Sequence, residues 1–352
     1  MKHLELHILQ SFPVACLNRD DLNSPKTAIF GGVQRARVSS QSWKRAIREL
    51  AKEISPHFKG QRTRLIVEPL RDALIAEGVA EAEALEKAKT LAEALATFDK
   101  DTEKKTGKLK VKTLFFTSHA ELKALAKAFQ ETGDVKKAIK KAASPEFLKD
   151  AADIALFGRM VANDHSLTLE GSALFGHALS THKVDNEIDF FAAVDDFQLD
   201  DEAGAGMTGT LEFNSATYYR FAALNLDMLA NKSHLQALTT DERREVVRAF
   251  IEATLQAVPG ARKNSMNAAT LPGYVLGVVR GSGHPVQLVN AFEVPVRAYG
   301  GKGLFELSLE RLKKERDELN KVWGLNKNEL FSGAIPDLNL VGFVAKVLEN
   351  VE

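Results

Sequence analysis

Residues 33–50 carry the most distinctive chemistry in the sequence, a run of cations that reads VQRARVSSQSWKRAIREL. No acidic residue stands between Val33 and Arg48, whereas a solvated cationic face normally intersperses acids with bases. Guanidinium and ammonium groups form charge-assisted hydrogen bonds with phosphate oxygens. The cations of this run are Arg35, Arg37, Lys44, Arg45 and Arg48. They indicate contact with a nucleic acid, and on these residues alone a solvated face stays the alternative.

A helix that begins near Ser39 or Ser40 must display part of this run, because both serines suit an N-cap. Its apolar residues recur at helical spacing and form the face toward the core: Trp43, Ile47, Leu50 and Ile54. The other side carries Gln41, Lys44, Arg45 and Arg48. Free backbone N–H groups at a helix N-terminus favour an anion, so we expect Ser39, Ser40 and Gln41 to take part in binding. A rise of about 1.5 Å per residue suits successive phosphates of a strand.

Composition limits where the protein works and what it can bind. The chain has 352 residues, no formal net charge and a single cysteine, Cys16, which excludes an internal disulfide and fits the cytoplasm. Its first residues, MKHLELHILQ, lack the apolar core of a signal peptide, and no run is long enough to span a bilayer, so we expect no membrane contact. With zero net charge, nucleic-acid binding must come from segregated charge. Eight acids between Asp185 and Glu202 form the opposing block.

Strand and helix patterns along the chain predict an α+β fold with two elaborations. Residues 3–9 alternate like a half-buried strand, and residues 273–280 and 285–299 have strand patterns as well. Residues 59–181 are rich in Ala and Glu and predict a mostly helical insert, with helices capped at Ser118 and Ser144. Residues 182–222 carry two strand-like arms around an acidic, Gly-rich middle and predict a long hairpin.

Other candidate sites in the sequence give no support for catalysis. Gly204, Gly206 and Gly209 spell G-x-G-x-x-G, but an acidic tract precedes them and a strand pattern follows, so we interpret them as a hairpin tip. The histidines and the one cysteine show no zinc-ligand spacing, and we expect no metal and no cofactor. Asp20 and Asp21 could chelate a metal, although their turn beside Arg19 suits capping or salt-bridge roles better.

One family accounts for these features together. The segment CLNRDDLNSPKTAIFGG, followed by RARVSSQSWKRAIR, covers residues 16–48 and resembles the backbone subunit, CasC, of the type I-E CRISPR surveillance complex Cascade. The resemblance continues through DIALFGRM (153–160), STHKVDNEIDFFAAVDD (180–196), LEFNSATYYRFAALNL (211–226) and NAFEVPV (290–296). Most of the chain is therefore covered.

The resemblance implies a fold and a mode of assembly. It implies an RRM-like (ferredoxin-like) palm made of residues 1–58 and 223–352, helical fingers at 59–181 and a hairpin thumb at 182–222. Copies of the subunit would stack head to tail along one CRISPR guide RNA, together with other Cascade subunits. The guide would be held by its backbone, with its bases free to pair with target DNA. Each thumb would interrupt the guide and turn one base outward.

The resemblance also implies individual RNA contacts. Positions that match guide-binding residues of the family are Arg19, Lys26, Ser39, Ser40, Gln41, Lys44 and Arg48, and we add Arg35, Arg37 and Arg45 on charge alone. Met160 and Phe191 match apolar residues that pack against the guide where it kinks. Because strand neighbours point to opposite faces, we expect one of Phe190 and Phe191 in the core and favour Phe191 for the RNA.

Three functions compete at this point. The first is a non-enzymatic RNA scaffold for antiviral defence, which also offers a positively charged path to the target strand. The second is a metal-dependent endoribonuclease, because backbone subunits of related type III effectors cut RNA with an aspartate in the loop that here holds Asp20 and Asp21. The third is an RNA-binding protein outside CRISPR. We further expect the thumb acids Asp200, Asp201 and Glu202 to meet bases of an adjacent copy.

Overall fold

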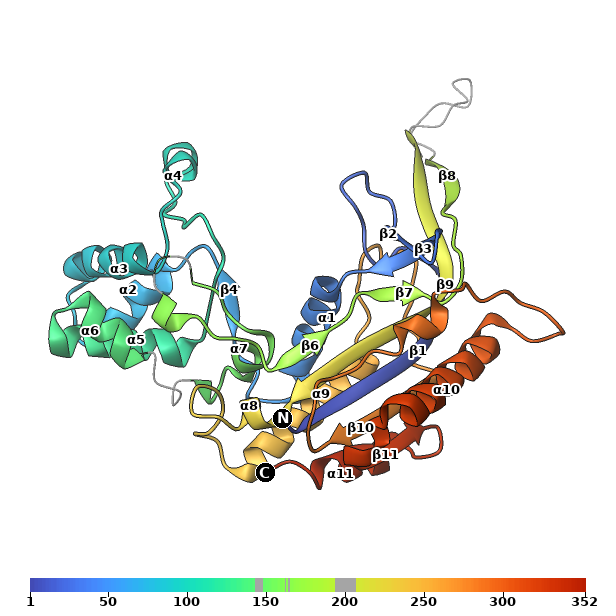
Figure 1. Cartoon of the computed structure of the whole chain (residues 1–352). Coiled ribbons are helices and arrows are strands. Elements are labelled where there is room, and N and C mark those ends of the chain that lie inside the picture. Colours follow the sequence, from blue (N-terminus) through green and yellow to red (C-terminus); the bar gives the residue numbers. More distant parts are fainter. Residues whose placement is uncertain (143–147, 162, 164, 194–206) are drawn as a thin grey trace, which may run out of the picture.

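A long antiparallel sheet forms the centre of the computed structural model (Figure 1), which describes the chain except residues 143–147, 162, 164 and 194–206. Its strands pair in the order β11-β10-β1-β9-β7-β3-β2, and β6 and β8 also pair with β9. The strands are β1 (His3–Ala15), β2 (Thr27–Phe30), β3 (Val33–Val38), β6 (Ala173–Phe175), β7 (Ala178–Ser180), β8 (Glu187–Ala193), β9 (Met207–Asn225), β10 (Tyr274–Arg280) and β11 (Glu329–Ile335). The prediction of an α+β fold is thereby confirmed, with a mainly antiparallel sheet.

Helices cover both faces of this sheet. One face packs against α1 (Ser40–Ile54), α7 (Ala152–Phe157), α8 (Leu226–Leu229), α9 (Thr240–Gln256) and α11 (Leu340–Leu348). The other face packs against η3 (Val289–Phe292) and α10 (Leu304–Trp323), which is followed by η4 (Leu325–Asn328). Figure 1 shows α9 and α10 on opposite sides of the sheet. None of the helices formed by the described residues is long and apolar enough to cross a bilayer.

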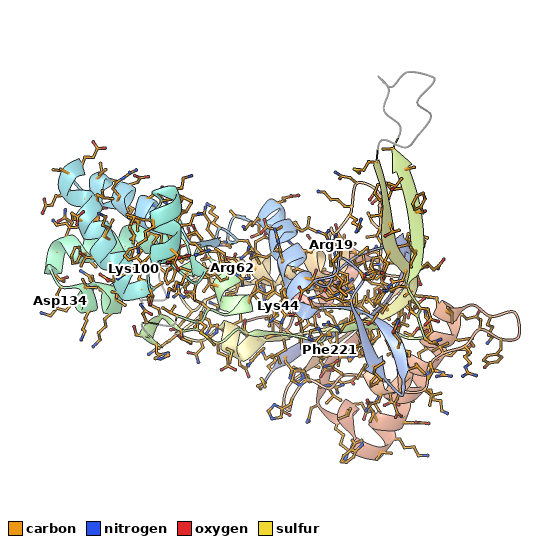
Figure 2. The ribbon with its side chains drawn as sticks, turned by 90° about the horizontal axis from the view of Figure 1, so that it is seen from above. Arg19, Lys44, Arg62, Lys100, Asp134 and Phe221 are labelled. Carbon is orange, nitrogen blue, oxygen red and sulfur yellow. The ribbon has the colours of Figure 1, made fainter. Side chains whose placement is uncertain are left out.

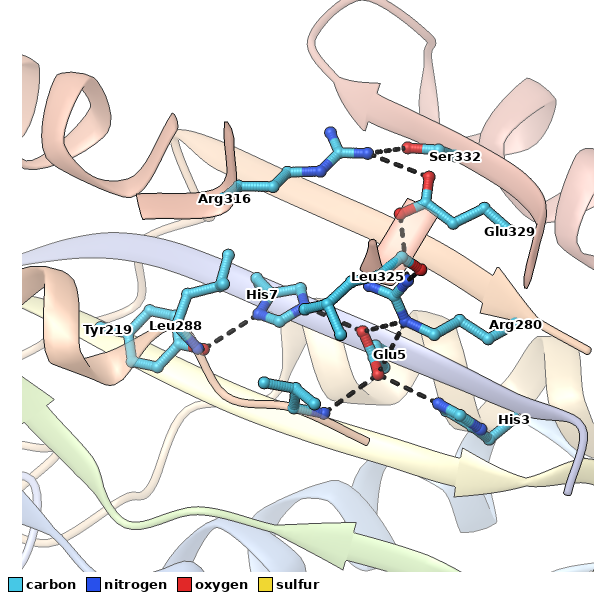
Figure 3. Close-up of polar contacts among 11 residues, drawn as sticks. His3, Glu5, His7, Tyr219, Arg280, Leu288, Arg316, Leu325, Glu329 and Ser332 are labelled. Carbon is cyan, nitrogen blue, oxygen red and sulfur yellow. Dashed lines mark hydrogen bonds and ion pairs between the residues drawn. The ribbon is translucent and has the colours of Figure 1, made fainter. Parts of the chain in front are cut away.

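The central strand β1 is buried on both faces, so the prediction of a half-buried strand is wrong for its first eight residues. Leu4, Leu6 and Ile8 enter the core beneath α1 and α9, as their alternation predicts. The polar side chains that alternate with them, those of His3, Glu5 and His7, lie in a buried network instead of solvent (Figure 3).

Glu5 is the centre of that network. Its carboxylate accepts hydrogen bonds from Arg280 Nε (3.2 Å) and the Val286 N–H (3.1 Å) and pairs with His3 Nε2 (3.0 Å) and His7 Nε2 (3.4 Å). Burial alone would raise the pKa of the Glu5 carboxyl, but these hydrogen bonds and the nearby positive charges hold it well below its ordinary value. A buried carboxylate is tolerated here because its charge and lone pairs are satisfied.

The helix α1 is anchored to the sheet through Trp43 and Ile47. Ser39 is its N-cap, since the Ser39 hydroxyl accepts the Ser42 N–H, and the predicted start is therefore confirmed. Ile47 is fully buried, and the Trp43 ring packs against Arg220 of β9, whose guanidinium carbon lies 3.6 Å from the ring centroid. Arg220 also donates to the Thr254 carbonyl at 2.5 Å and to the Gln10 side chain, and burial lowers the pKa of Arg220 to about 9.

A separate helical body has its own core. It contains β4 (Gln61–Thr63), α2 (Val67–Ala76), α3 (Glu81–Leu95), α4 (Lys100–Thr106), β5 (Phe115–Thr117), α5 (His119–Thr132) and α6 (Val135–Ala142). Its apolar cluster runs from Ile66 to Leu167 and includes Leu70, Leu91 and Leu125. Residues of α7, β6 and β7 pack with the main sheet, so this core ends before residue 181, the predicted end of the insert.

Three local predictions have different outcomes. The strand predicted at 285–299 is wrong: η3 and irregular chain lie there, and their apolar residues are periodic because Leu288, Phe292 and Val296 pack onto the sheet face. Ser118 caps α5 through the Glu121 N–H, whereas the Glu121 carboxylate contacts Thr117 and Arg159. The helix start predicted at Ser144 lies outside the described residues.

The predicted hairpin is present as β8 and β9, paired from Glu187 opposite Phe213 to Ala193 opposite Met207. In Figure 1 it projects away from the sheet, and β9 continues from the hairpin into the sheet centre beside β1. Gly209 lies within β9, while Gly204 and Gly206 of the G-x-G-x-x-G pattern lie outside the described residues. The acids Asp200, Asp201 and Glu202 lie outside them as well.

The burial of α1 gives a stability prediction. Ile47→Ala should lower the free energy of unfolding by about 2–5 kcal/mol, because Ile47 is fully buried and its removal leaves a cavity beneath the helix. Urea denaturation followed by circular dichroism measures the change. The matched control is Ile29→Ala, at a side chain that is 73% exposed, with an expected change within about 0.5 kcal/mol. Equal shifts for the two variants would contradict this packing.

Candidate nucleic-acid interface

The candidate interface centres on the N-terminal half of α1, between the helical body and the hairpin. Figure 2 shows Arg19, Lys44 and Arg62 in this region, with Lys100 and Asp134 on the helical body at one end. Among the predicted RNA-binding residues, Arg19, Gln41, Arg45 and Met160 are exposed, and Lys26, Arg37, Ser40, Lys44 and Phe191 are half-buried. Ser39, Arg35 and Arg48 are buried. The fold therefore brings most of the predicted cations to one region and withdraws two of them.

Several polar groups in the first turn of α1 already form hydrogen bonds within the protein. Ser39 donates its backbone N–H to Asn18 Oδ1 at 2.9 Å, and its hydroxyl accepts the Ser42 N–H at 3.2 Å. The Ser40 N–H points to His177 Nδ1 at 3.3 Å. Burial and the charge of Arg37 lower the pKa of His177, which favours the neutral ring that can accept this bond. A phosphate would reach Gln41 and the Ser40 hydroxyl before Ser39.

Arg35 must be removed from the predicted contacts. Its side chain is fully buried, and its guanidinium donates to the backbone carbonyls of Phe30 (3.2 Å), Ser180 (3.0 Å), Phe292 (2.8 Å) and Glu293 (3.1 Å). Burial, with a smaller contribution from the charge of Arg311, lowers the pKa of Arg35. Arg35 ties the β2–β3 hairpin to η3, and charge alone could not distinguish this structural role from RNA contact.

Gly31 at the tip of the same hairpin makes the closest approach to η3. Its φ is +60°, and a Cβ at this position would lie 1.7 Å from the Glu293 carbonyl oxygen. Only glycine tolerates both the backbone conformation and this distance. The Arg35 hydrogen bonds and the Gly31 contact therefore hold the tip of the β2–β3 hairpin against the residues after η3.

Arg48 also departs from the predicted solvent-facing stripe. It is 9% exposed and lies where α1 meets the helical body, with its guanidinium carbon 5.1 Å from the centroid of the Phe116 ring. Its Nη2 donates to Glu49 Oε1 at 3.1 Å, while Nε and Nη1 have no hydrogen-bond partner among the described residues. Helical spacing alone predicts that Arg48 faces solvent, because the sequence does not show that β5 covers this side of α1.

The loop after β1 presents Arg19 and holds the two aspartates in a turn. Arg19 Nη1 donates to Asn23 Oδ1 at 2.7 Å. Asp20 Oδ1 accepts the backbone N–H groups of Leu22 (2.9 Å) and Ser24 (3.0 Å), which is the capping role that the sequence favours. Cys16, at the start of this loop, is buried, and its burial raises the pKa of the thiol.

A groove of about 920 Å³ runs along the exposed side of α1. One wall is the loop with Arg19 and Asp20, the floor includes Ser42 and Arg45 of α1, and the other wall is residues 256–263 with Lys263. Its width and mixed charge suit an extended polar chain better than a small apolar ligand. Lys263 was missed in the sequence, where the pair Arg262–Lys263 after Pro259–Gly260 was its only signal.

The apolar candidates lie on the surface. Met160 is 85% exposed, and Phe190 is 66% exposed, so the prediction that one of Phe190 and Phe191 lies in the core is wrong. Phe191 is half-buried because its ring covers Gly209, the residue opposite it on β9. A two-stranded hairpin has no core on either face, so both rings remain near the surface. Phe190 is the more accessible of the two for stacking.

Metal-ligating side chains do not gather in the described part of the chain. Within it, no three His, Cys, Asp or Glu residues lie close enough together to hold a metal ion. Asp20 and Asp21 therefore stand without further ligands among these residues, and the endoribonuclease alternative gains no support from the geometry.

A family model described as CT1975-like protein matches residues 4–338, which is nearly the whole chain. The chain belongs to the CT1975-like protein family. A search of curated proteins found no match.

Solved structures similar to this CT1975-like chain come from CRISPR complexes. A chain of a "CRISPR RNA-guided surveillance complex, pre-nicking" has 27% sequence identity and a TM-score of 0.78, over 99% of this chain and 100% of that one. A chain of a "CRISPR RNA-guided surveillance complex" has 24% identity and a TM-score of 0.61, over 99% and 98%, and supports the fold alone. The resemblance to a backbone subunit of such a complex is confirmed, while its assignment to type I-E stays a prediction.

Where the helical body of the CT1975-like chain joins the sheet, a buried carboxyl group faces Arg48. Asp153 of α7 is fully buried; its Oδ1 accepts the Gly60 N–H at 3.1 Å, and its Oδ2 has no hydrogen-bond partner within the described residues. A Cβ at Gly60 would lie 2.4 Å from this carboxylate, so glycine is needed for the close approach. Burial raises the pKa of Asp153 to about 6, and the positive charge of Arg48 partly opposes the rise.

Asp153 gives a pH-dependent stability prediction. An Asp in the unfolded chain ionises near pH 3.8, whereas folded Asp153 does so near pH 6, so the contribution of Asp153 to stability should fall as pH rises through this window. Asp153→Asn removes the ionisation, and its free energy of unfolding relative to the wild type should rise by about 2 kcal/mol between pH 4 and pH 7. Urea denaturation at pH 4, 5, 6 and 7 measures the difference.

The control for this prediction is Asp21→Asn, at an exposed loop carboxylate, which should follow the wild type at every pH. Parallel wild-type and Asp153→Asn curves across the series would show that Asp153 is not held in the neutral form by burial.

Proposed function

We propose that this chain is a non-enzymatic RNA-binding scaffold subunit of a type I-E CRISPR surveillance complex. The full-length similarity to a chain of a "CRISPR RNA-guided surveillance complex, pre-nicking" carries the proposal, because it spans 99% of this chain and 100% of the other at 27% identity. In this proposal the main sheet and its helices are the RRM-like palm, the helical body is the fingers, and the β8–β9 hairpin is the thumb.

The candidate interface supports a role in holding the guide by its backbone. Arg19 lies in the loop after β1, and Lys44 and Arg45 lie on α1. No acidic residue occurs in α1 before Glu49. Such groups contact phosphates irrespective of base identity, which suits a subunit that must accept many different guide sequences. The bases then remain free to pair with target DNA.

The hairpin supplies the apolar part of the proposed interface. Phe190 of β8 and Met160 after α7 expose large apolar side chains, although each directly follows a charged residue in the sequence. An unstacked base gains back lost stacking energy on such a surface. We propose that Met160 and the Phe190–Phe191 pair contact the guide where it bends, and that copies of the subunit align along it with other Cascade subunits.

Salt dependence tests backbone readout. Replacing Arg19 and Lys44 together by Ala should weaken RNA binding for every guide sequence and flatten the dependence of log K on log salt by about 1.4, for two phosphate contacts at about 0.7 each. Fluorescence anisotropy at several salt concentrations with two unrelated guides measures both effects.

The matched control removes two exposed lysines from α10, on the opposite side of the sheet. Lys314→Ala with Lys321→Ala changes the net charge equally but should leave both affinity and salt slope near the wild-type values. A loss confined to one guide sequence, or an equal loss in the control, would contradict backbone readout by the candidate interface.

The scaffold role also predicts that bound RNA stays intact. We expect no cleavage of an RNA complementary to the guide when the assembled protein is incubated with Mg²⁺ or Mn²⁺, because Asp20 serves the turn and gathers no further ligands among the described residues. Gel electrophoresis of end-labelled RNA provides the measurement. Metal-dependent cleavage that disappears in Asp20→Ala or Asp21→Ala would instead establish the endoribonuclease alternative.

A further inference from the structure

Three cations meet where α1 faces the first strand of the helical body. Lys44 and Arg48 come from α1, and Arg62 comes from β4 (Figure 2). The guanidinium of Arg62 lies 4.6 Å and that of Arg48 5.1 Å from the centroid of the same ring, Phe116. The two bodies thus bring like charges together across their junction, which costs free energy unless an anion neutralises them.

Two neighbouring acids balance only part of this charge: Glu49 pairs with Arg48, and the charge of Asp153 acts on both Arg48 and Arg62. Glu49 accepts a hydrogen bond from Arg48 Nη2 and contacts Lys52, on the exposed side of α1. Asp153 is fully buried and bonds to the Gly60 N–H. Within the described residues, neither Lys44 nor Arg62 has a carboxylate oxygen within 4.0 Å. Lys44 is half-buried and Arg62 is exposed. Burial and the charge of Arg62 lower the pKa of Lys44.

Arg48 provides a second and independent sign of a missing ligand. It is nine-tenths buried, yet two of its N–H-bearing nitrogens, Nε and Nη1, have no hydrogen-bond partner in the part of the chain that the structure describes. Unsatisfied donors of a buried cation are costly, and such groups are almost always paired in folded proteins.

We infer that Lys44, Arg48 and Arg62 form one phosphate-binding subsite, in which a nucleic-acid phosphate bridges the sheet body and the helical body. This inference rests on the proposed function and adds to it Arg62, which neither the cationic run nor the matched segments include. Phe116 positions the two guanidinium groups, since an aromatic ring holds each of them by its face and leaves the edges free to donate.

The subsite has a consequence for the molecule as a whole. The phosphate would contact α1 on one side and β4 on the other, so binding would join two bodies that have separate apolar cores. RNA binding should therefore hold the guide and also stabilise the junction between the sheet body and the helical body.

The test is a double-mutant cycle between the two bodies. Arg62→Gln alone should weaken RNA binding about tenfold at fixed salt, the loss expected for one charged hydrogen bond, and flatten the salt slope by about 0.7. Lys44→Ala alone should do the same. Because both side chains would bind one phosphate, the double variant should lose clearly less than the sum of the two, whereas independent sites would give additive losses.

Two controls make the outcome unambiguous. Arg71→Gln removes a half-buried arginine, paired with Asp72, from α2 of the same body and should leave RNA binding unchanged. Arg62→Lys keeps the charge and should retain most of the affinity, and thermal unfolding without RNA should show that every variant is folded. If the wild type binds RNA and Arg62→Gln binds it as tightly as Arg71→Gln does, the shared subsite is overturned. Additive losses in the cycle overturn it as well. Failure of the wild type to bind RNA would refute the proposed function itself.

Discussion

The pairing of β1 with β9 is the constraint on which the rest of the structure depends. It joins residues about two hundred positions apart, from His3 opposite Asn225 to Ala15 opposite Asn214. β1 runs on into the loop that presents Arg19, and β9 runs back into the hairpin that presents Phe190. The same ladder therefore sets the distance between the cationic and the apolar parts of the proposed interface, and each part includes residues on regular structure, Lys44 on α1 and Phe190 on β8.

Burial decides which cations of the run remain available. Arg35, Arg48 and Arg220 are all withdrawn from solvent, and each is held by an aromatic ring: Phe30, Phe116 and Trp43 respectively. Arg35 and Arg220 also have carbonyl or amide oxygens for their donors, so they serve the fold. Among the described residues, Arg48 lacks such acceptors for part of its guanidinium, and this difference is why we propose a ligand for Arg48 and not for the other two.

The sequence predicts those parts of the fold in which local pattern and burial agree. The α1 helix with its Ser39 cap, the long hairpin and the α+β class follow from spacing and capping chemistry. The errors occur where tertiary packing overrides the pattern. Glu5 and its neighbours alternate like a solvated face but lie buried, since Arg280 arrives from β10 to neutralise the carboxylate.

The same limit applies to the candidate site. Arg45 and Arg48 look equivalent in the sequence, and only the contact with Phe116, more than sixty residues away, buries the second. Arg62 has no local signal, because its strand is three residues long and isolated from the cationic run. Its proximity to Lys44 arises entirely from how the two bodies join, which no periodicity along the chain encodes.

The burial of Cys16 has a practical consequence for spectroscopy. Its thiol is enclosed and resists deprotonation, so thiol-directed dyes will find little to react with in the native chain. A cysteine introduced at the exposed Met160 position would therefore be the reactive attachment point for a fluorophore or a spin label. Energy transfer or distance measurements could then follow the surface beside α7 during assembly, with the natural cysteine left in place.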